Sequence, residues 1–171
     1  MQTFRIDCCL RPKSILDKGI RRTELHYFCD GSQSGYGACC YLRSFTDSGV
    51  VRGSLLMGKA RVTPVKVLTI PRVELQAAVL ASETHAFLKC NIDIEIDQVY
   101  FWTDSTIVLG YIKNDITRYK VFVANRVQQI RNHSSCNDWH HVSTAENPAD
   151  VASRGCTLRE LISSSWVHGP K

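Results

Sequence analysis

The sequence predicts an α/β fold: a mixed five-stranded sheet, with three antiparallel strands followed by parallel additions, flanked by helices. Three apolar, strand-like runs come first, and short turns rich in glycine and serine join them. After these runs, strand patterns alternate with helical patterns, the order that adds parallel strands to a sheet. The 171 residues, 44% of them hydrophobic, suffice for a globular core.

The first half of the chain is expected to form an antiparallel meander and then a helix. The three strands are expected at residues 25–30, 38–45 and 50–59. A glycine-rich turn at 31–37 joins the first two, and Thr46-Asp47-Ser48-Gly49 reads as a hairpin turn before the third. A helix is expected to begin at Pro71, because proline is favoured at the first helical position. Residues at helical spacing define its core face: Val73, Ala77, Leu80, Thr84 and Leu88.

The second half is expected to add two strands and three helices. The strands are placed at 98–104 and 138–142, and the helices at 105–112, at 118–132 and from residue 147. Asn147 is a suitable cap for the last helix, and Pro148 suits its first position.

Four acidic residues stand where predicted strands end or predicted helices begin: Asp30, Glu74, Asp104 and Asp150. The carboxyl ends of strands in α/β sheets are common places for chemistry. Four carboxylates brought together cannot all ionise without cations, and Mg²⁺ prefers oxygen ligands. Two such ions activate water and stabilise the leaving oxygen in phosphodiester hydrolysis. For Glu74 and Asp150 the alternative is that an acidic residue simply stabilises a helix N-terminus.

Several stretches resemble the ribonuclease H domain of LTR retrotransposon polyproteins, and most closely that of the BEL/Pao group. The resemblance covers roughly residues 24–170. The stretches that carry it are Leu25-His26-Tyr27-Phe28-Cys29-Asp30-Gly31-Ser32, Leu68-Thr69-Ile70-Pro71-Arg72-Val73-Glu74-Leu75, Trp102-Thr103-Asp104-Ser105 and Asn147-Pro148-Ala149-Asp150-Val151-Ala152-Ser153-Arg154-Gly155. The BEL/Pao group in particular is indicated by Thr69-Ile70-Pro71-Arg72-Val73-Glu74, Asp104-Ser105-Thr106-Ile107-Val108-Leu109-Gly110 and Tyr119-Lys120-Val121-Phe122-Val123-Ala124-Asn125-Arg126.

The resemblance implies a ribonuclease H-like fold and a two-metal nuclease that cuts the RNA strand of RNA/DNA hybrids during reverse transcription. It implies two Mg²⁺ ions, for which Mn²⁺ substitutes, held by Asp30, Glu74, Asp104 and Asp150. Substrate contacts are expected from Gly31, Ser32, Gln33, Ser105 and Asn147. Contact with the 2′-OH is how such a site distinguishes RNA from DNA.

The sequence departs from cellular ribonucleases H in two loops. The loop before the last acidic residue, Ser143-Thr144-Ala145-Glu146, lacks the histidine that many of them carry, so turnover is expected to be slow or to involve Glu146. The long basic protrusion is absent, and the upstream reverse transcriptase is expected to supply most of the grip on the hybrid. The helix at 118–132 is basic, and its charge suits either a solvated face or hybrid binding; the residues are Arg118, Lys120, Arg126 and Arg131.

Residues 1–23 are expected to be a segment leading in from an upstream polyprotein, 24–165 the ribonuclease H-like domain and 166–171 a tail. The net charge of +5 and the pI near 8.8 suit a polyanionic partner. None of the eight cysteines forms a C-x-x-C pair, which argues against structural zinc. Several lie inside apolar runs, as buried free thiols do, which indicates a reducing compartment. We expect an intracellular, cytoplasmic protein, including inside virus-like particles, without membrane association and monomeric in isolation.

Three alternatives stay open from the sequence alone. Asp47-Ser48-Gly49 matches the tripeptide of retroelement aspartic peptidases, although Arg43-Ser44-Phe45-Thr46 before it is not the apolar run that such a site needs. A non-catalytic connection or domesticated module of the same fold would keep the sheet without the activity. An integrase or exonuclease of the wider superfamily is disfavoured, because no suitable glutamate follows Asp104 at the integrase spacing.

Overall fold

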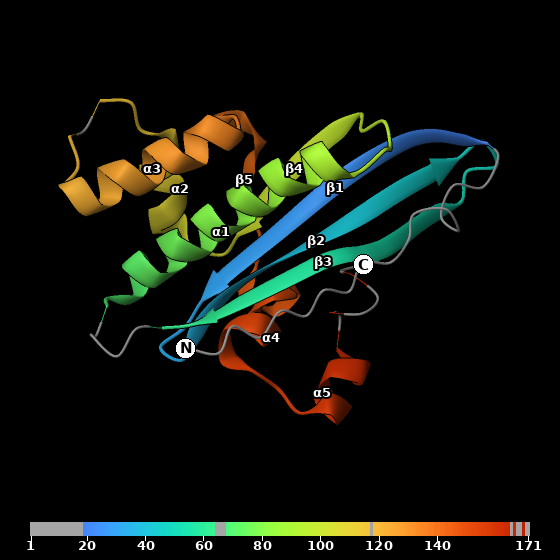
Figure 1. Ribbon diagram of the computed structural model, residues 1–171. Coiled ribbons are helices and arrows are strands. Elements are labelled where there is room, and N and C mark those ends of the chain that lie inside the picture. Colours follow the sequence, from blue (N-terminus) through green and yellow to red (C-terminus); the bar gives the residue numbers. More distant parts are fainter. Residues whose placement is uncertain (1–18, 64–67, 117, 165, 167–168, 170–171) are drawn as a thin grey trace.

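The computed structural model describes residues 19–63, 68–116, 118–164, 166 and 169 (Figure 1). Its centre is a five-stranded sheet in the order β3-β2-β1-β4-β5, which confirms the predicted mixed sheet. The antiparallel strands are β1 (Ile20–Gly31), β2 (Gly35–Thr46) and β3 (Val51–Val62). The parallel additions are β4 (Gln98–Thr103) and β5 (Trp139–His141).

The middle strand, β1, fixes the register of both halves of the sheet. It runs antiparallel to β2, with Asp30 opposite Gly37, and parallel to β4, with Cys29 opposite Thr103. Asp30 and Asp104 each come one residue after that last pair. Because parallel neighbours end at the same edge of a sheet, the register brings these two carboxylates to one edge.

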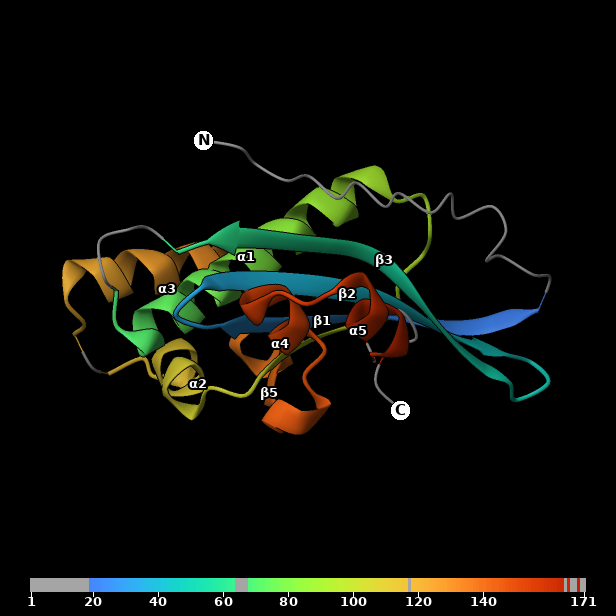
Figure 2. The same cartoon turned by 90° about the horizontal axis from the view of Figure 1, so that it is seen from below.

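Helices lie on both faces of the sheet (Figures 1 and 2). On one face α1 (Ile70–Asn91) crosses β1 and β2, and α3 (Val121–His133) packs beside α1. The short α2 (Thr106–Lys113) follows β4 and contacts α1, α3 and β5. On the other face α4 (Ala149–Arg154) rests on β1 and β2, and α5 (Leu158–Ser163) follows it.

The main core lies between the sheet and α1. The predicted core face of α1 is confirmed, since all five of its residues are buried: Val73, Ala77, Leu80, Thr84 and Leu88. Beneath α1, the rings of Tyr27, Phe101 and Trp139 stack across β1, β4 and β5, with centroids 4.9 and 4.7 Å apart. Such stacked aromatic pairs stabilise a sheet beyond their buried area, and here they tie its parallel half to its antiparallel half.

Some predicted boundaries were wrong. β1 begins at Ile20, before the expected residue 25, because its polar start pairs with the end of β2. The buried residues there have partners: Thr23 N donates to Asp97 (2.7 Å), and Glu24 pairs with Arg22 (2.7 Å). α4 begins at Ala149 with Pro148 at the cap position, although Asn147 Oδ1 still accepts from Ala149 N (3.1 Å).

The carboxyl-terminal end of the domain also differs from expectation. The sequence prediction missed α5, a short helix with a capping box formed by Thr157 and Glu160. Trp166, placed in the predicted tail, packs over Gly58, and its carbonyl accepts from Tyr41 OH (2.7 Å). The predicted lead-in segment lies outside the described residues up to residue 18, while residues 20–23 belong to β1.

Two further observations concern the described residues alone. None of the helices there has the length and apolarity that a membrane crossing needs. The six cysteines described are all free thiols: Cys29, Cys39, Cys40, Cys90, Cys136 and Cys156.

Candidate active site

Asp30 and Asp104 occupy neighbouring strand ends. Asp30 is the penultimate residue of β1 and is only 7% exposed, while Asp104 directly follows β4 and is partly exposed. Thr144 Oγ1 donates to Asp104 Oδ2 (2.8 Å), which connects β4 to the turn that precedes α4. The two strand ends therefore form the base of the candidate site.

Glu74 lies near these strand ends because α1 packs directly on the end of β1. A Cβ atom on Gly31 would lie only 2.7 Å from the backbone nitrogen of Glu74 and from the carbonyl carbon of Val73. Only glycine allows such a close approach of two backbones. Ser105 then fixes the Glu74 side chain: its hydroxyl donates to Glu74 Oε2 (2.6 Å) while accepting from Val108 N (3.2 Å) as the cap of α2.

Asp150 arrives from the opposite face of the sheet on α4. This helix also needs a glycine beneath it, since a Cβ on Gly37 would lie 2.5 Å from Ala152 Cβ. Ser153, three residues after Asp150 and thus on the same helix side, donates its hydroxyl to Asp30 Oδ2. Asp150 Oδ1 lies 2.7 Å from Arg154 Nε, without the geometry of a hydrogen bond.

Burial and neighbouring charges shift the pKa values of two of the four carboxyl groups. Burial raises the pKa of Asp30 above its usual value, the Ser153 hydroxyl opposes this, and the charges of Asp104 and Asp150 raise it further. Burial also raises the pKa of Glu74, Ser105 opposes it, and Asp104 and Asp30 add to the rise. The fold thus gathers acidic groups that repel one another, an arrangement that costs stability unless cations are present.

Each carboxylate is turned toward a partner of its own. The partners are Ser153 for Asp30, Ser105 for Glu74, Thr144 for Asp104 and Arg154 for Asp150. Accordingly, among the described residues no three acidic, histidine or cysteine side chains are already arranged to hold a metal ion. Converging on a shared ion requires these side chains to turn away from their hydroxyl and guanidinium partners.

The family model described as "Pao retrotransposon-like RNaseH-like domain" matches residues 2–105, more than half of the 171-residue chain. The chain belongs to this family. The resemblance to BEL/Pao retrotransposons is therefore confirmed. The match includes Asp30, Glu74 and Asp104, whereas Asp150 lies beyond it. No curated protein sequence matches the chain.

A solved structure of a ribonuclease H domain confirms the ribonuclease H-like fold. The N-terminal ribonuclease H domain of a Mycobacterium tuberculosis protein, solved as a fusion with maltose-binding protein, superposes with a TM-score of 0.51 at 13% identity, covering 77% of this chain and 94% of that one. Two further matches are ribonuclease H1 of Halobacterium salinarum (TM-score 0.43, 17% identity, 83% and 98% covered) and LC11 ribonuclease H1 in complex with an RNA/DNA hybrid (0.49, 11%, 77% and 93%).

The residues predicted to touch substrate take different places in this ribonuclease H-like domain. Gln33 is exposed in the turn after β1, whereas Ser32 donates to Ser153 O (2.7 Å) and so anchors that turn to α4. Ser105 caps α2 and holds Glu74. Asn147 is buried, and its amide donates to Cys29 O (3.1 Å), which ties the start of α4 to β1.

Sequence reasoning missed the hydrogen-bond partners Ser153 and Thr144 and the ion-pair partner Arg154. Two of the three carried a signal, because Ser153 and Arg154 follow Asp150 at the helical spacings i+3 and i+4. Thr144 carried none, since it lies 40 residues from Asp104 and meets it only through the fold.

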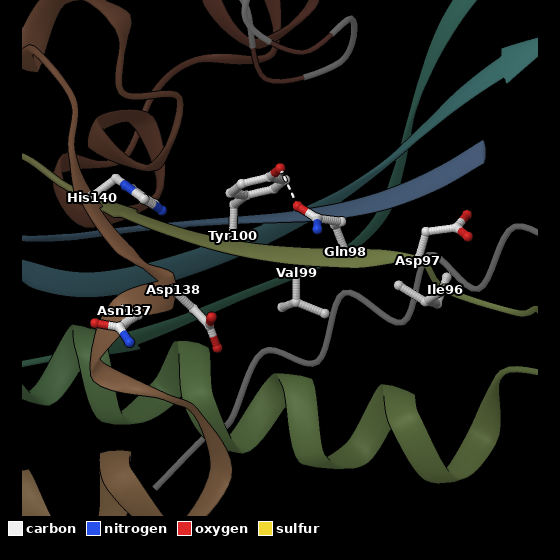
Figure 3. Close-up of a pocket in the computed structure, with 8 residues that line it drawn as sticks. All are labelled: Ile96, Asp97, Gln98, Val99, Tyr100, Asn137, Asp138 and His140. Carbon is white, nitrogen blue, oxygen red and sulfur yellow. Dashed lines mark hydrogen bonds between the residues drawn. The ribbon is translucent and has the colours of Figure 1, made fainter.

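The groove in Figure 3 is not part of this site. It is lined by residues from the start of β4 and from the segment around β5, including Gln98, Tyr100 and His140. The carboxylates lie at the other end of β4, after Thr103. The candidate site is consequently at the opposite end of β4 from this groove.

We expect Ser153→Ala to lower the free energy of unfolding by about 1–2 kcal/mol near neutral pH, because the buried Asp30 carboxylate loses a donor. The loss should shrink as the pH falls and Asp30 takes up a proton, since hydrogen bonds to charged groups are the stronger ones. Urea unfolding at several pH values measures this, with Ser34→Ala in the exposed turn as control. A pH-independent loss would mean that Ser153 acts through packing alone.

Proposed function

We propose that this ribonuclease H-like domain hydrolyses the RNA strand of RNA/DNA hybrids with the help of two divalent metal ions. The observation that carries the proposal is that β1, α1, β4 and α4 each place a carboxylate near one sheet edge, where burial and the like charges of neighbouring carboxylates raise the pKa values of Asp30 and Glu74. Repulsion between these carboxylates destabilises a purely structural domain, whereas cations bound between them would offset it.

The donor set fits Mg²⁺, with Mn²⁺ as a substitute, because all four candidate ligands are carboxylates and hard cations prefer oxygen. Asp30 and Asp104 would be the central ligands, Glu74 would complete one site and Asp150 the other. Bound metal supplies Lewis acidity and lowers the pKa of a coordinated water. Ser153, Ser105 and Thr144 hold the carboxylates at the edge until the ligands reorient.

Substrate selection is assigned to the turn after β1. Ser32 donates its hydroxyl to Ser153 O of α4 and its N–H to Gly35 O, and these two hydrogen bonds fasten the turn beside Asp30. Backbone groups in that position suit contact with a ribose 2′-OH, the group that distinguishes RNA from DNA. The proposed partner that delivers the hybrid is the upstream reverse transcriptase domain of the polyprotein. The ribonuclease H-like domain itself is proposed to be monomeric and to act in the cytoplasm or in virus-like particles.

One alternative has an observation in its favour. Every carboxylate already has a partner in the described structure, as a non-catalytic connection or domesticated module would also show. The peptidase alternative has none, because Asp47 and Ser48 lie exposed in the hairpin turn between β2 and β3. Cleavage measurements separate the nuclease from both.

The deciding experiment incubates the full chain with an end-labelled RNA/DNA hybrid in Mg²⁺, in Mn²⁺ and in chelator. We expect metal-dependent cutting of the RNA strand only, abolished in Asp104→Asn and unchanged in Asp47→Asn, which removes an exposed acidic group in a turn. If folded protein fails to cut in either metal, also when fused to the upstream polymerase, the nuclease proposal is wrong and the non-catalytic module replaces it.

A further inference from the structure

β4 is paired along its whole length on one side but only in part on the other. β1 pairs with all six of its residues, whereas β5 pairs only with Phe101–Thr103. The first three residues, Gln98–Tyr100, therefore have an open outer edge in the described structure. Thr103 O accepts from Val142 N on the β5 side (3.1 Å). Because every second residue of a strand turns its backbone groups to the same side, Val99 presents its N–H and C=O at the open edge.

The edge is open because the chain before β5 turns away as a short 3₁₀ helix. This helix spans Cys136–Asp138, and Ser135 and Asp138 close it with a capping box. In the register of β5, Asp138 would stand opposite Tyr100, yet its N–H is used within the turn, where it donates to Ser135 O (3.1 Å). The groove in Figure 3 lies at this gap beside the first half of β4.

Carboxylates stand on both sides of the open edge. In Figure 3, Asp97 and the ring of Tyr100 project to one side of β4, and Asp138 projects to the other. Each carboxylate uses one oxygen inside the protein: Asp97 Oδ2 accepts from Thr23 N (2.7 Å), and Asp138 Oδ2 accepts from Ser135 N (3.1 Å). Among the described residues neither carboxylate pairs with a lysine or arginine, and the lining of the groove contains neither residue type. The groove therefore carries negative charge that the protein leaves uncompensated.

This charge favours a basic polypeptide strand over nucleic acid or a second copy of the chain. The two carboxylates would repel the phosphates of a nucleic acid, and pairing with the β4 edge of a second copy would place like charges against each other. An arginine guanidinium instead forms two parallel hydrogen bonds with a carboxylate and stacks on rings such as that of Tyr100. Because neighbouring residues of a strand point to opposite faces, two adjacent arginines would meet Asp97 and Asp138 on the two sides of the edge.

We propose that the open edge of β4 binds an extended segment of a partner polypeptide that carries two adjacent arginines. The backbone of this segment pairs with Val99, and its guanidinium groups bind Asp97 and Asp138. Adding a strand to an exposed sheet edge is a recurring way of binding peptides, in which main-chain bonds give affinity and side-chain contacts give specificity. Five residues at about 3.3 Å each separate Val99 from Asp104, so the docked partner leaves the carboxylate site accessible.

Peptide affinity tests the contribution of the two carboxylates. The probe is a blocked, fluorescently labelled hexapeptide with two adjacent arginines between threonines, and its binding to the full chain is measured by anisotropy. Asp97→Asn with Asp138→Asn should weaken binding about tenfold, because hydrogen bonds to charged groups are lost. Asparagine keeps the oxygen that each carboxylate uses inside the protein, so the variant should fold. Asp47→Asn with Glu83→Gln makes the same change of charge at exposed positions outside the groove and should leave the affinity unchanged.

Amide hydrogen exchange tests where the peptide binds. Saturating peptide should slow exchange at Val99 and leave Thr103, which already lies between two strands, unchanged. A peptide with glutamates in place of the arginines should not bind. Equal weakening in the control variant, binding without slower exchange at Val99, or no binding to the unsubstituted chain would each overturn the proposal. Protection of Val99 by a single-stranded oligonucleotide but not by the peptide would also overturn it and assign the groove to nucleic acid.

Discussion

A Gly31→Ala protein is expected to lose about 3 kcal/mol of unfolding free energy and its hybrid cleavage together. The added methyl would stand 2.7 Å from backbone atoms of Val73 and Glu74, where no rotamer change relieves the clash. α1 must therefore lift from the end of β1, which takes Glu74 away from Asp30. Chemical denaturation measures the first effect, and metal-dependent cleavage under conditions where the variant is folded measures the second.

Gly110→Ala is the matched control, because Gly110 lies exposed in α2 with nothing within 4 Å of the added Cβ. Replacing a helical glycine by alanine should stabilise the protein by about 0.5–1 kcal/mol. Equal unfolding free energies and equal cleavage in the two variants would contradict the close packing of α1 on the end of β1.

Asp30→Asn is expected to reduce cleavage by more than about a hundredfold and yet raise the melting temperature of the metal-free protein. Loss of a residue behind the metal ligands typically costs 10–100-fold, and a ligand itself should cost more. The stability gain follows because burial and the charges of Asp104 and Asp150 make the Asp30 carboxylate unfavourable in the folded state. Asparagine keeps an oxygen that accepts from Ser153.

The same physics predicts the pH dependence behind this gain. Asp30 and Glu74 have raised pKa values in the folded state, so the folded chain holds more protons than the unfolded chain between the unfolded and folded pKa values. Stability without metal should therefore rise as the pH falls through that interval, and less so in Asp30→Asn. Asp93→Asn, in an exposed loop, should change neither property. A melting temperature lowered by Asp30→Asn without metal would contradict this account.

The sequence predicted the backbone plan because its signals are local. Alternating and helical spacing identified the meander and the core face of α1, and proline marked the starts of α1 and α4 within one residue. Carboxylates at these boundaries pointed to one sheet edge, and the register of β1 with β4 brings Asp30 and Asp104 there. The periodicity of the sequence is enough to predict such positions, because neighbouring parallel strands end at the same edge of a sheet.

The missed features depend on contacts between distant parts of the chain. The polar start of β1 is a strand because it pairs with the end of β2, more than 20 residues later, and because Asp97, 74 residues later, accepts from Thr23 N. Thr144 meets Asp104, and Arg72 meets Phe122, through packing that no local pattern encodes. The basic residues of the α3 region show the same limit, since burial and stacking rather than charge separate Arg126 from Arg131.

The placement of Asp150 on α4 has a consequence for the making of the protein. Domains form from the amino terminus during synthesis, and here all five strands, α1 and three of the carboxylates precede α4 in the chain. The ribosome therefore releases the fourth carboxylate, with Ser153, after the sheet that receives it. A product of interrupted translation ending before α4 would carry the sheet and α1 but would lack Asp150 and Ser153, and therefore the complete set of four carboxylates.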